Sequence, residues 1–380
     1  MTTSPNGEGS FAIDGSPGTG RWRPRLTARS EILAFAGLAA LAAVAILALG
    51  RDATFFHDEW WYLCGRALGD MESWFLPHNE HWVTVHVLVY RALVETFGTA
   101  SYLPFHGALV LTHLAAAGGL FALVRREVDP GAGLAAAAIL LFFGAGYVNL
   151  FWAFQTGFVG AVALGLWAMV ALPARPRLAA LLLVAAVATQ GVGLYFVVAA
   201  AAATLWRRDL PSMPWLAAPV AAYAAWAFLE RDAIEVRGGG GDPVDTLRFA
   251  VVGGLTAAGM GLGRLPGALA IVAVVLMRPS LTPLLVAGAL GLASEFVSLA
   301  LVRTGFARPE SSHYLYVAAP FVLMIGASVT RSARVLGLGI GALVFTVNVG
   351  LLVNHGLAWK AETDASRAQG ADEVPAGVCR

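Results

Sequence analysis

The chain has 380 residues, of which 58% are hydrophobic and only 13% are charged, and its formal net charge is +1. A soluble domain carries about a quarter charged residues, so the composition excludes an ordinary soluble protein, and the near-neutral charge gives no indication of nucleic-acid binding. Uncharged runs long enough to cross a bilayer recur at 32–50, 104–124, 131–172 and 335–359. Only helices and closed barrels satisfy their backbone polar groups in lipid, and these runs are too long for barrel strands. The sequence therefore predicts an all-α, polytopic transmembrane helical bundle in a lipid bilayer.

Residues 1–30 are rich in Gly, Ser and Pro and end in a group of arginines. This composition predicts a disordered leader, and its basic residues place it on the cytoplasmic side. The apolar run that follows is longer than the core of a signal peptide, so it is expected to be an uncleaved first span. Arginine outnumbers lysine so strongly that Lys360 is the only lysine, which is typical of bacterial genes of high GC content.

The positions of the arginines orient the predicted spans. Assigning basic ends to the cytoplasmic side gives about eleven crossings, with ten to twelve as the range. The transmembrane domain is predicted as 31–355 and a polar tail at 356–380 as external. The expected localisation is the cytoplasmic membrane of a bacterial cell envelope, as a multi-pass protein.

Three stretches require a less regular interpretation. The run 131–172 fits a hairpin that turns outside near 144–149. Residues 178–205 have basic residues at both ends and are too short for two full spans, which favours two short helices that turn at 190–194. Residues 249–261 are predicted to form an interfacial or re-entrant helix ahead of a crossing at 262–278.

The first external loop, 51–101, contains the densest polar chemistry. Its stretch FFHDEWWYLCGRALGDMESWFLPHNEHW, residues 55–82, holds five acidic residues, three histidines and four tryptophans. Asp58 and Glu59 follow the first span closely, just above the hydrocarbon boundary. Residues 61–74 have roughly helical spacing, which predicts helix lying flat at the interface. The candidate site residues here are His57, Asp58, Glu59, Trp61, His78, Asn79, Glu80 and His81.

Simpler interpretations of this loop stay open. Tryptophans at a membrane interface are ordinary anchors. The histidines and carboxylates could converge on a divalent cation, although their spacing matches no compact metal motif. His106 and His113 lie within a span, where a hydrogen-bonded contact between helices is the expected role.

An acidic pair in the first external loop, soon after the first span, resembles the GT-C superfamily of integral-membrane glycosyltransferases. That family includes protein O-mannosyltransferases and lipid A aminoarabinose transferases. The segments that carry the resemblance are FFHDEWWYL (55–63), NEHW (79–82), NLFWAFQTGFV (149–159) and RPESSHYLYVAAP (308–320). The sequence departs from the family pattern in the last segment, where His313 precedes Tyr314 at a position that often holds arginine.

The resemblance implies an inverting sugar transfer at the outer face of the membrane, without a nucleotide sugar. The donor would be linked to a polyprenyl phosphate, and the acceptor would be a glycan, a lipid or a protein. Asp58 would act as the general base on the acceptor, with Glu59 as a supporting carboxylate. No cofactor is certain, and a divalent cation is possible.

Elementary chemistry favours the same reaction. A hydroxyl acceptor needs a base within hydrogen-bond reach, and carboxylates stabilise a cationic sugar. A departing phosphate needs positive charge or hydrogen-bond donors. The predicted outer loop before the penultimate span supplies Arg303, Arg308, His313 and Tyr314, and Gln155 follows the hairpin turn closely.

Each of these assignments has an alternative. The arginines could bind anionic lipid head groups, and Gln155 could form a plain hydrogen bond between helices. Glu295 lies within a span, where a carboxylate is functional by default or pairs with Arg264 or Arg303. At the level of the whole protein, the main alternative is a transporter or flippase for a lipid-linked or amphipathic substrate. Such a protein is expected to show paired half-repeats, and the sequence shows no convincing repeat; a non-catalytic scaffold is a third possibility.

Overall fold

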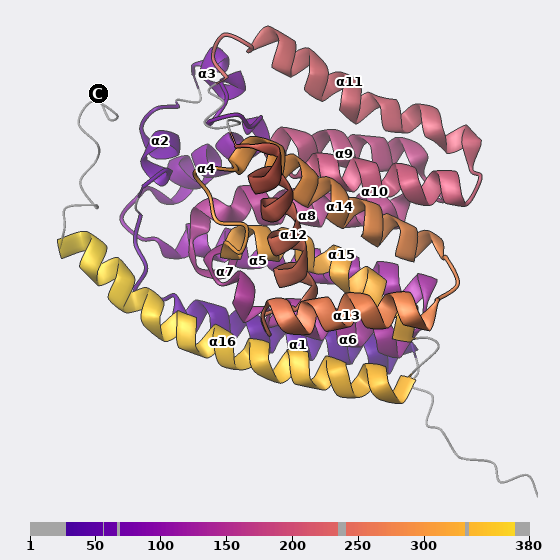
Figure 1. Cartoon of the computed structure of the whole chain (residues 1–380). Helices are drawn as coiled ribbons and strands as arrows, with labels where there is room; N and C mark the ends of the chain where they lie inside the picture. The colour runs from indigo at the N-terminus through magenta and orange to yellow at the C-terminus, as the bar shows by residue number, and fades with distance from the viewer. Residues whose placement is uncertain (1–27, 56, 67–68, 235–240, 331–333, 369–380) are drawn as a thin grey trace, which may run out of the picture.

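The computed structural model describes residues 28–55, 57–66, 69–234, 241–330 and 334–368. The predicted leader falls outside these residues except for its last three. The described residues form helices and short 3-10 turns, joined by loops (Figure 1). They contain no strand, since their only bridge is an isolated pairing of His78 with His81. The prediction of an all-α bundle is confirmed.

The helices in chain order begin and end as follows: α1 Ala28–Leu49, α2 Glu59–Leu63, α3 Met71–Phe75, α4 Thr84–Phe97, α5 Leu103–Glu127, α6 Pro130–Leu141, α7 Val148–Phe151, α8 Thr156–Ala171, α9 Pro176–Thr189, α10 Gly193–Trp206, α11 Met213–Leu229, α12 Pro243–Ala258, α13 Arg264–Met277, α14 Pro283–Arg303, α15 Ser312–Thr330 and α16 Arg334–Ala368. The 3-10 turns are η1 Gly144–Gly146, η2 Ala153–Gln155 and η3 Leu210–Ser212. Several starts follow from proline in the first turn and a capping side chain, as at Asp129, Asp242 and Thr282.

Seven segments among the described residues are long and apolar enough to cross a membrane, judged by length and composition: 29–49, 103–127, 153–171, 210–229, 283–303, 312–329 and 337–365. Four shorter apolar segments accompany them, at 130–146, 176–189, 193–206 and 264–277. Each segment that was expected to cross therefore corresponds to an apolar helix. The helix α16 continues past residue 355 into the stretch that was predicted as a tail.

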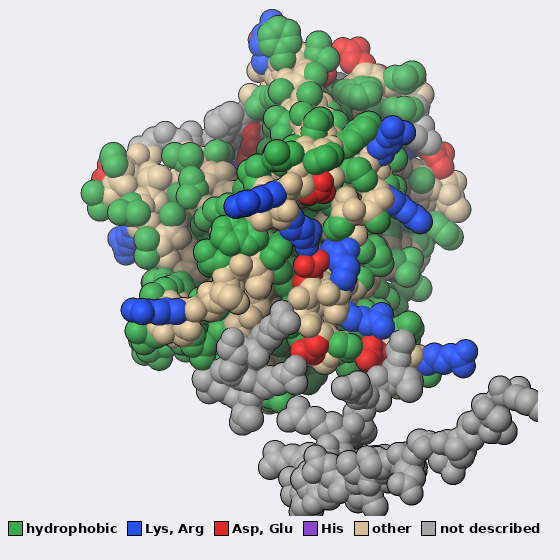
Figure 2. All heavy atoms as spheres, turned by 90° about the vertical axis from the view of Figure 1, so that its right-hand side faces the viewer, with side chains coloured by type: hydrophobic (Ala, Val, Ile, Leu, Met, Phe, Trp, Pro, Cys, Tyr) green, Lys and Arg blue, Asp and Glu red, His purple; other side chains and the backbone are tan. Residues whose placement is uncertain are grey.

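The long helices run side by side, so the bundle has two ends (Figure 1). The loop end carries α2, α3 and α4 together with the end of α1, and it lies on the left in Figure 1. At the opposite end, which we call the basic end, Arg125 pairs with Glu31 and Arg207 pairs with Glu127. Figure 2 views this end and shows basic side chains scattered over it among apolar ones.

The run 131–172 turns between α6 and α8, as predicted for a hairpin, but the turn, residues 142–155, is an irregular and largely buried segment. Phe143, Asn149 and Phe151 are almost fully inaccessible. The backbone N–H of Ala145 donates to Asn348 of α16, and the Asn348 amide donates to the carbonyl oxygen of Met260 at the end of α12. The protein therefore buries most of this irregular backbone and satisfies part of its hydrogen bonding through α16.

The pair of short helices predicted for 178–205 is confirmed as α9 and α10. Their connection, Gln190 to Val192, is buried, and the Gln190 side chain accepts a hydrogen bond from the N–H of Gly191. Because α9 and α10 are short, their connection lies inside the bundle and leaves room between it and the loop end for another segment. The side chain of His81 from the first loop fills that space, because a Cβ on Gly191 would lie 2.7 Å from His81 Nδ1.

The two histidines within the second span have the structural role that was expected. His106 Nε2 lies 3.0 Å from the carbonyl oxygen of Leu150. His113 Nδ1 lies 2.7 Å from the Tyr316 hydroxyl, and its Nε2 lies 3.2 Å from the carbonyl oxygen of Leu141. Both rings therefore join α5 to the buried hairpin segment or to α15.

Candidate functional site

The loop between α1 and α4 is folded around Arg66. Its buried guanidinium donates to the carbonyl oxygens of Ser73 (2.8 Å), Leu76 (2.5 Å) and Pro77 (2.7 Å). The expected helix over 61–74 is therefore divided into α2 and α3, with Arg66 in the stretch between them. Because one side chain binds three backbone carbonyls, the segment that follows, His78 to His81, has a fixed position.

Residues His78 to His81 form a tight turn that is the centre of the candidate site. The N–H of each histidine donates to the carbonyl oxygen of the other, both at 3.1 Å. Asn79 adopts a φ of 54°, in the left-handed region that asparagine tolerates better than most residues. The turn presents His78 toward one group of side chains, around Asp58, and Glu80 and His81 toward another, around Arg303.

On the first side, His78 faces Asp58. Its Nε2 lies 3.6 Å from Asp58 Oδ2, just beyond direct hydrogen-bond reach. The His78 ring packs against Tyr62 and Phe154, with centroids 5.4 Å from each. The Asp58 side chain is 44% exposed, so its carboxylate stands at the surface, where a substrate hydroxyl can reach it.

Glu59 points into the protein and not toward the surface. It is fully buried, and its Oε1 accepts hydrogen bonds from the hydroxyls of Tyr90 (2.8 Å) and Tyr102 (3.1 Å). Burial, followed by the negative charge of Glu59, raises the pKa of both tyrosines. The Tyr102 hydroxyl also accepts from the N–H of Ala153. Glu59 thus ties α2 to α4 and to the start of α5, and so holds its neighbour Asp58 in place.

On the second side of the turn, Glu80 pairs with Arg303 at the end of α14. Glu80 Oε1 contacts Arg303 Nη2, and both side chains are largely buried, with 13% and 15% exposed. Arg303 Nη2 also donates to His81 Nε2 at 3.2 Å. The second oxygen of Glu80, Oε2, is buried and makes no hydrogen bond within the described residues.

Burial, with further contributions from His78 and His313, lowers the pKa of His81 to about 3. The Glu80 carboxylate lies 3.4 Å from the same His81 nitrogen and would favour a proton on it. The guanidinium of Arg303 can only donate, however, so Nε2 must be the acceptor. His81 is therefore neutral at neutral pH, and Arg303 carries the positive charge of this group.

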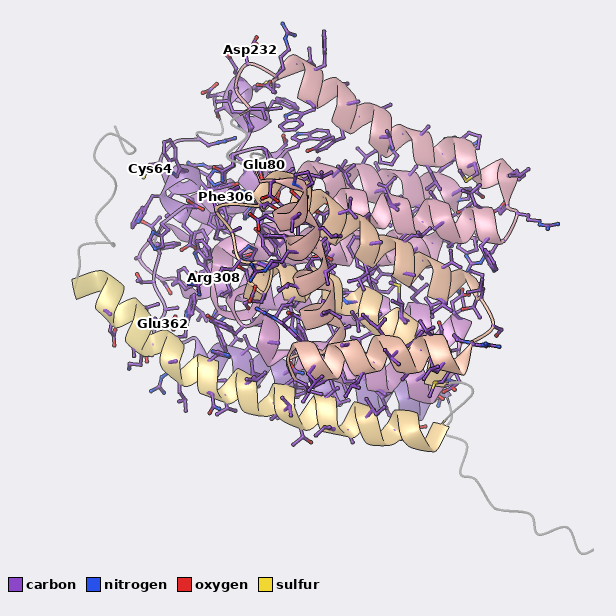
Figure 3. The ribbon with its side chains drawn as sticks, in the orientation of Figure 1. Cys64, Glu80, Asp232, Phe306, Arg308 and Glu362 are labelled. Atoms are coloured by element: carbon purple, nitrogen blue, oxygen red, sulfur yellow. The ribbon has the colours of Figure 1, made fainter. Side chains whose placement is uncertain are left out.

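His313, at the start of α15, completes the second side. Its ring lies 4.1 Å from that of Tyr314 and 5.9 Å from that of Phe158. The Phe158 ring in turn lies 6.3 Å from His81. The loop from α14 to α15 also carries Phe306, 5.3 Å from the Arg303 guanidinium, and Figure 3 shows Phe306 and Arg308 on the same side of the molecule as Glu80.

Sequence reasoning missed His86, a buried neighbour of this site. It lies on α4, and its ring is packed against Tyr62 and Phe154 at 4.7 and 5.3 Å. Neither ring nitrogen makes a hydrogen bond within the described residues, and burial lowers its pKa to about 3. A Cβ on Gly157 would come within 2.7 Å of it. The only signal was a histidine on the apolar face of an amphipathic helix.

The remaining candidates lie at the edges of these two groups. His57 and Arg308 are exposed, and Trp61 is 51% exposed. Gln155 is buried, and its side-chain oxygen accepts from the Asn149 amide at 3.3 Å, as expected for a contact between segments. Tyr314 is buried beside Arg303. No group of three metal-ligating side chains is arranged to hold an ion in the described part of the chain.

Glu295 does not pair with either arginine that the sequence suggested. Arg264 pairs with Glu310, and Arg303 pairs with Glu80. Glu295 is fully buried in α14, and its two oxygens have no hydrogen-bond partner among the described residues. It lies close to Tyr195 and Tyr314, about two turns before Arg303 in the same helix.

These helices define the fold of a multi-pass helical membrane protein, judged by the length and composition of its apolar segments. The chain is similar in fold to the crystal structure of ArnT from Cupriavidus metallidurans bound to undecaprenyl phosphate, with a TM-score of 0.51 and 16% sequence identity. The match covers 92% of this chain and 74% of ArnT. No protein-family model and no curated protein matches the sequence. At this identity the similarity establishes a shared fold, so activity has to be argued from the site.

Proposed function

We propose that the protein is a glycosyltransferase that moves a sugar from a polyprenyl-phosphate carrier to an acceptor at the outer face of the membrane. One observation carries the proposal. The four-residue turn His78 to His81 brings a surface carboxylate, Asp58, and a largely buried cation, Arg303, to opposite sides of the same short segment. The ArnT structure, which shares the fold, was solved with undecaprenyl phosphate.

Asp58 is the base in this proposal. As the acceptor oxygen bonds to the anomeric carbon of the sugar, its proton passes to the Asp58 carboxylate. The bond from that carbon to the phosphate oxygen breaks, and the phosphate leaves with the electron pair. Attack opposite the leaving group inverts the anomeric configuration. His78, 3.6 Å from Asp58, orients the carboxylate, and Glu59 fixes the start of α2 through its two tyrosine partners.

The donor phosphate is assigned to Arg303, with His313 and Tyr314 beside it. A leaving phosphate needs donors arranged in advance, and the Arg303 guanidinium is positioned by Glu80 and His81 before any ligand arrives. The Glu80 carboxylate therefore binds the guanidinium at the place that a phosphate would take. Arg308, which is exposed on the same loop, and Trp61 at the surface remain candidate contacts for the carrier and the sugar.

The orientation follows from charge. The basic end, with Arg125 and Arg207, is assigned to the cytoplasm by the positive-inside rule. The loop end, and with it Asp58, then faces outward. A carrier-linked sugar suits that side, because it brings its own leaving group and needs no cytoplasmic nucleotide.

The test is transfer from a radiolabelled polyprenyl-phosphate sugar by the purified full chain in nanodiscs. Asp58→Asn should lower transfer by about 10²–10⁴-fold, the usual contribution of a general base, without loss of folding. Asp232→Asn is the matched control, since Asp232 is 89% exposed and lies well away from Glu80 in Figure 3. Unchanged transfer by a folded Asp58→Asn protein would refute the assignment. Movement of the carrier across the bilayer of sealed proteoliposomes, without transfer, would favour a flippase.

A further inference from the structure

A second polar site lies on the other face of the loop that joins α14 to α15. It is an open groove of about 280 Å³ between α12, the start of α13 and this loop. Arg303 turns its side chain toward Glu80 and His81, whereas the next two residues, Thr304 and Gly305, line the groove. Gly305 has a φ of 98°, which favours glycine and lets the chain turn back over α12. The groove is therefore separate from the proposed donor-phosphate position.

The groove carries both signs of charge. Arg264 and Glu310 form an ion pair across it. Asp245 and Arg248 line the wall formed by α12, and neither has an ion-pair partner within the described residues. Two guanidiniums and two carboxylates in one groove give no net charge. Such an arrangement suits a ligand that has a negative and a positive group of its own.

The walls of the groove continue into apolar surface. On α12 the exposed residues Val244, Leu247 and Val251 follow helical spacing, in a stripe beside the lining residues. On α13 a similar exposed stripe contains Leu265, Leu269, Val272 and Leu276. Apolar helix faces that end in a charged groove are typical of the boundary between acyl chains and lipid head groups.

We infer that this groove binds the head group of an aminophospholipid, with its acyl chains along the exposed faces of α12 and α13. The phosphate would pair with Arg248, the free guanidinium. The primary ammonium would donate to Asp245 and Glu310, which a quaternary ammonium cannot do because it has no N–H. In an anionic lipid, the position of the ammonium is taken by a negative group or by a neutral one. Neither would form an ion pair with Asp245 and Glu310. The volume is smaller than a typical pocket for a drug-sized ligand and fits a head group rather than a whole lipid.

Native mass spectrometry of the full chain in detergent tests this inference. Phosphatidylethanolamine, phosphatidylcholine and phosphatidylglycerol with identical acyl chains are titrated in separate experiments. The ethanolamine lipid should bind at least fivefold more tightly than either of the others. Equal binding of the three lipids, or preference for the glycerol lipid, would overturn the inference.

Two variants then locate the site. Arg248→Gln should weaken binding of all three lipids about fivefold or more, because each has a phosphate. Asp245→Asn should remove the advantage of ethanolamine over choline and leave choline binding unchanged. Arg231→Gln is the matched control, an exposed arginine at the same end of the bundle. A loss in the control equal to that in Arg248→Gln would place the lipid elsewhere, and if either variant failed to fold, the order of the three lipids on the unmodified chain would still decide.

A last arm separates a lipid from a soluble ligand. Water-soluble glycerophosphoethanolamine has the same head group without acyl chains. It should bind at least tenfold more weakly than the lipid if the apolar stripes contribute. Equal affinity would overturn the assignment of a membrane lipid.

Discussion

In the proposed function, the donor phosphate replaces Glu80 as the partner of Arg303. If this is right, removing the charge of Glu80 should strengthen phosphate binding and not weaken it. In the ligand-free protein, Glu80 Oε1 holds the guanidinium, and the donor phosphate has to take its place or share it. A hydrogen bond to a charged group contributes about 1.5–3 kcal/mol, and a neutral one is roughly half as strong. Glu80→Gln should therefore weaken the internal competitor by about 0.8–1.5 kcal/mol and tighten phosphate binding about three- to twelvefold.

Arg303→Gln should do the opposite. It removes the charge-assisted contact and should weaken phosphate binding about tenfold to a hundredfold. It also leaves Glu80, only 13% exposed, without its cation, at a cost of up to about 3 kcal/mol in stability. The double variant Glu80→Gln/Arg303→Gln has no unpaired charge, so it should recover most of the stability but none of the binding. Comparison of the single and double variants therefore distinguishes a loss of stability from a loss of phosphate binding.

The assay is titration of the purified chain with farnesyl phosphate, a short soluble analogue of the carrier, by isothermal calorimetry. Thermal unfolding of each variant is measured in parallel, and Arg231→Gln serves as the control for loss of an exposed arginine. If Glu80→Gln weakens binding as much as Arg303→Gln, Glu80 contributes to the ligand site and does not compete with it. Normal binding by the double variant would show that the phosphate does not use Arg303.

Three further predictions concern the groups around the turn. Tyr102→Phe should lower stability by about 1–3 kcal/mol, because it leaves buried Glu59 short of a donor, and the surviving folded protein should keep its kcat; a selective loss of kcat would instead make Glu59 catalytic. His78→Ala should lose transfer at least about tenfold and recover part of it with added imidazole if the ring orients Asp58, whereas a packing role would not respond. The pKa of His81 is about 3 in the folded protein and 6.5 ordinarily, so the unfolded chain binds more protons between these values. The contribution of His81 to the free energy of unfolding should be complete above about pH 6.5 and fall by up to about 1.4 kcal/mol per pH unit below it. When thermal unfolding is measured across this range, the melting temperature of His81→Asn should depend less on pH than that of the unmodified chain.

The spans were predictable because lipid imposes one strong rule. Uncharged runs of sufficient length had to be helices, and the run that was too short for two spans had to break near Gln190, where it does. The turn over residues 142–155 was predictable, but its burial was not. Its glycines and aromatic residues look like those of an external turn, and only the position of Asn348 in a distant helix reveals that the segment is buried.

The candidate site was predictable in content more than in arrangement. Density of His, Asp, Glu and Trp singled out the loop whose side chains the fold brings together with Arg303. Which charges pair was decided by three-dimensional packing: Arg303 was one of two possible partners for Glu295, and it is held instead by Glu80, from a segment more than 200 residues earlier. Glu59 and Asp58 are adjacent in sequence, yet one faces tyrosines inside and the other faces the surface, because the first turn of α2 rotates neighbouring side chains to different sides.

Asn348 sets an order of events during synthesis. The buried segment 142–155 bonds to α16 through Ala145, and a ribosome produces α16 only after some two hundred intervening residues. Until it emerges, the N–H of Ala145 lacks its acceptor, and the surface that packs against Gly144 is missing, since a Cβ at Gly144 would meet the α16 backbone at 2.1 Å. Newly inserted chains should therefore remain sensitive to membrane proteases until translation is complete.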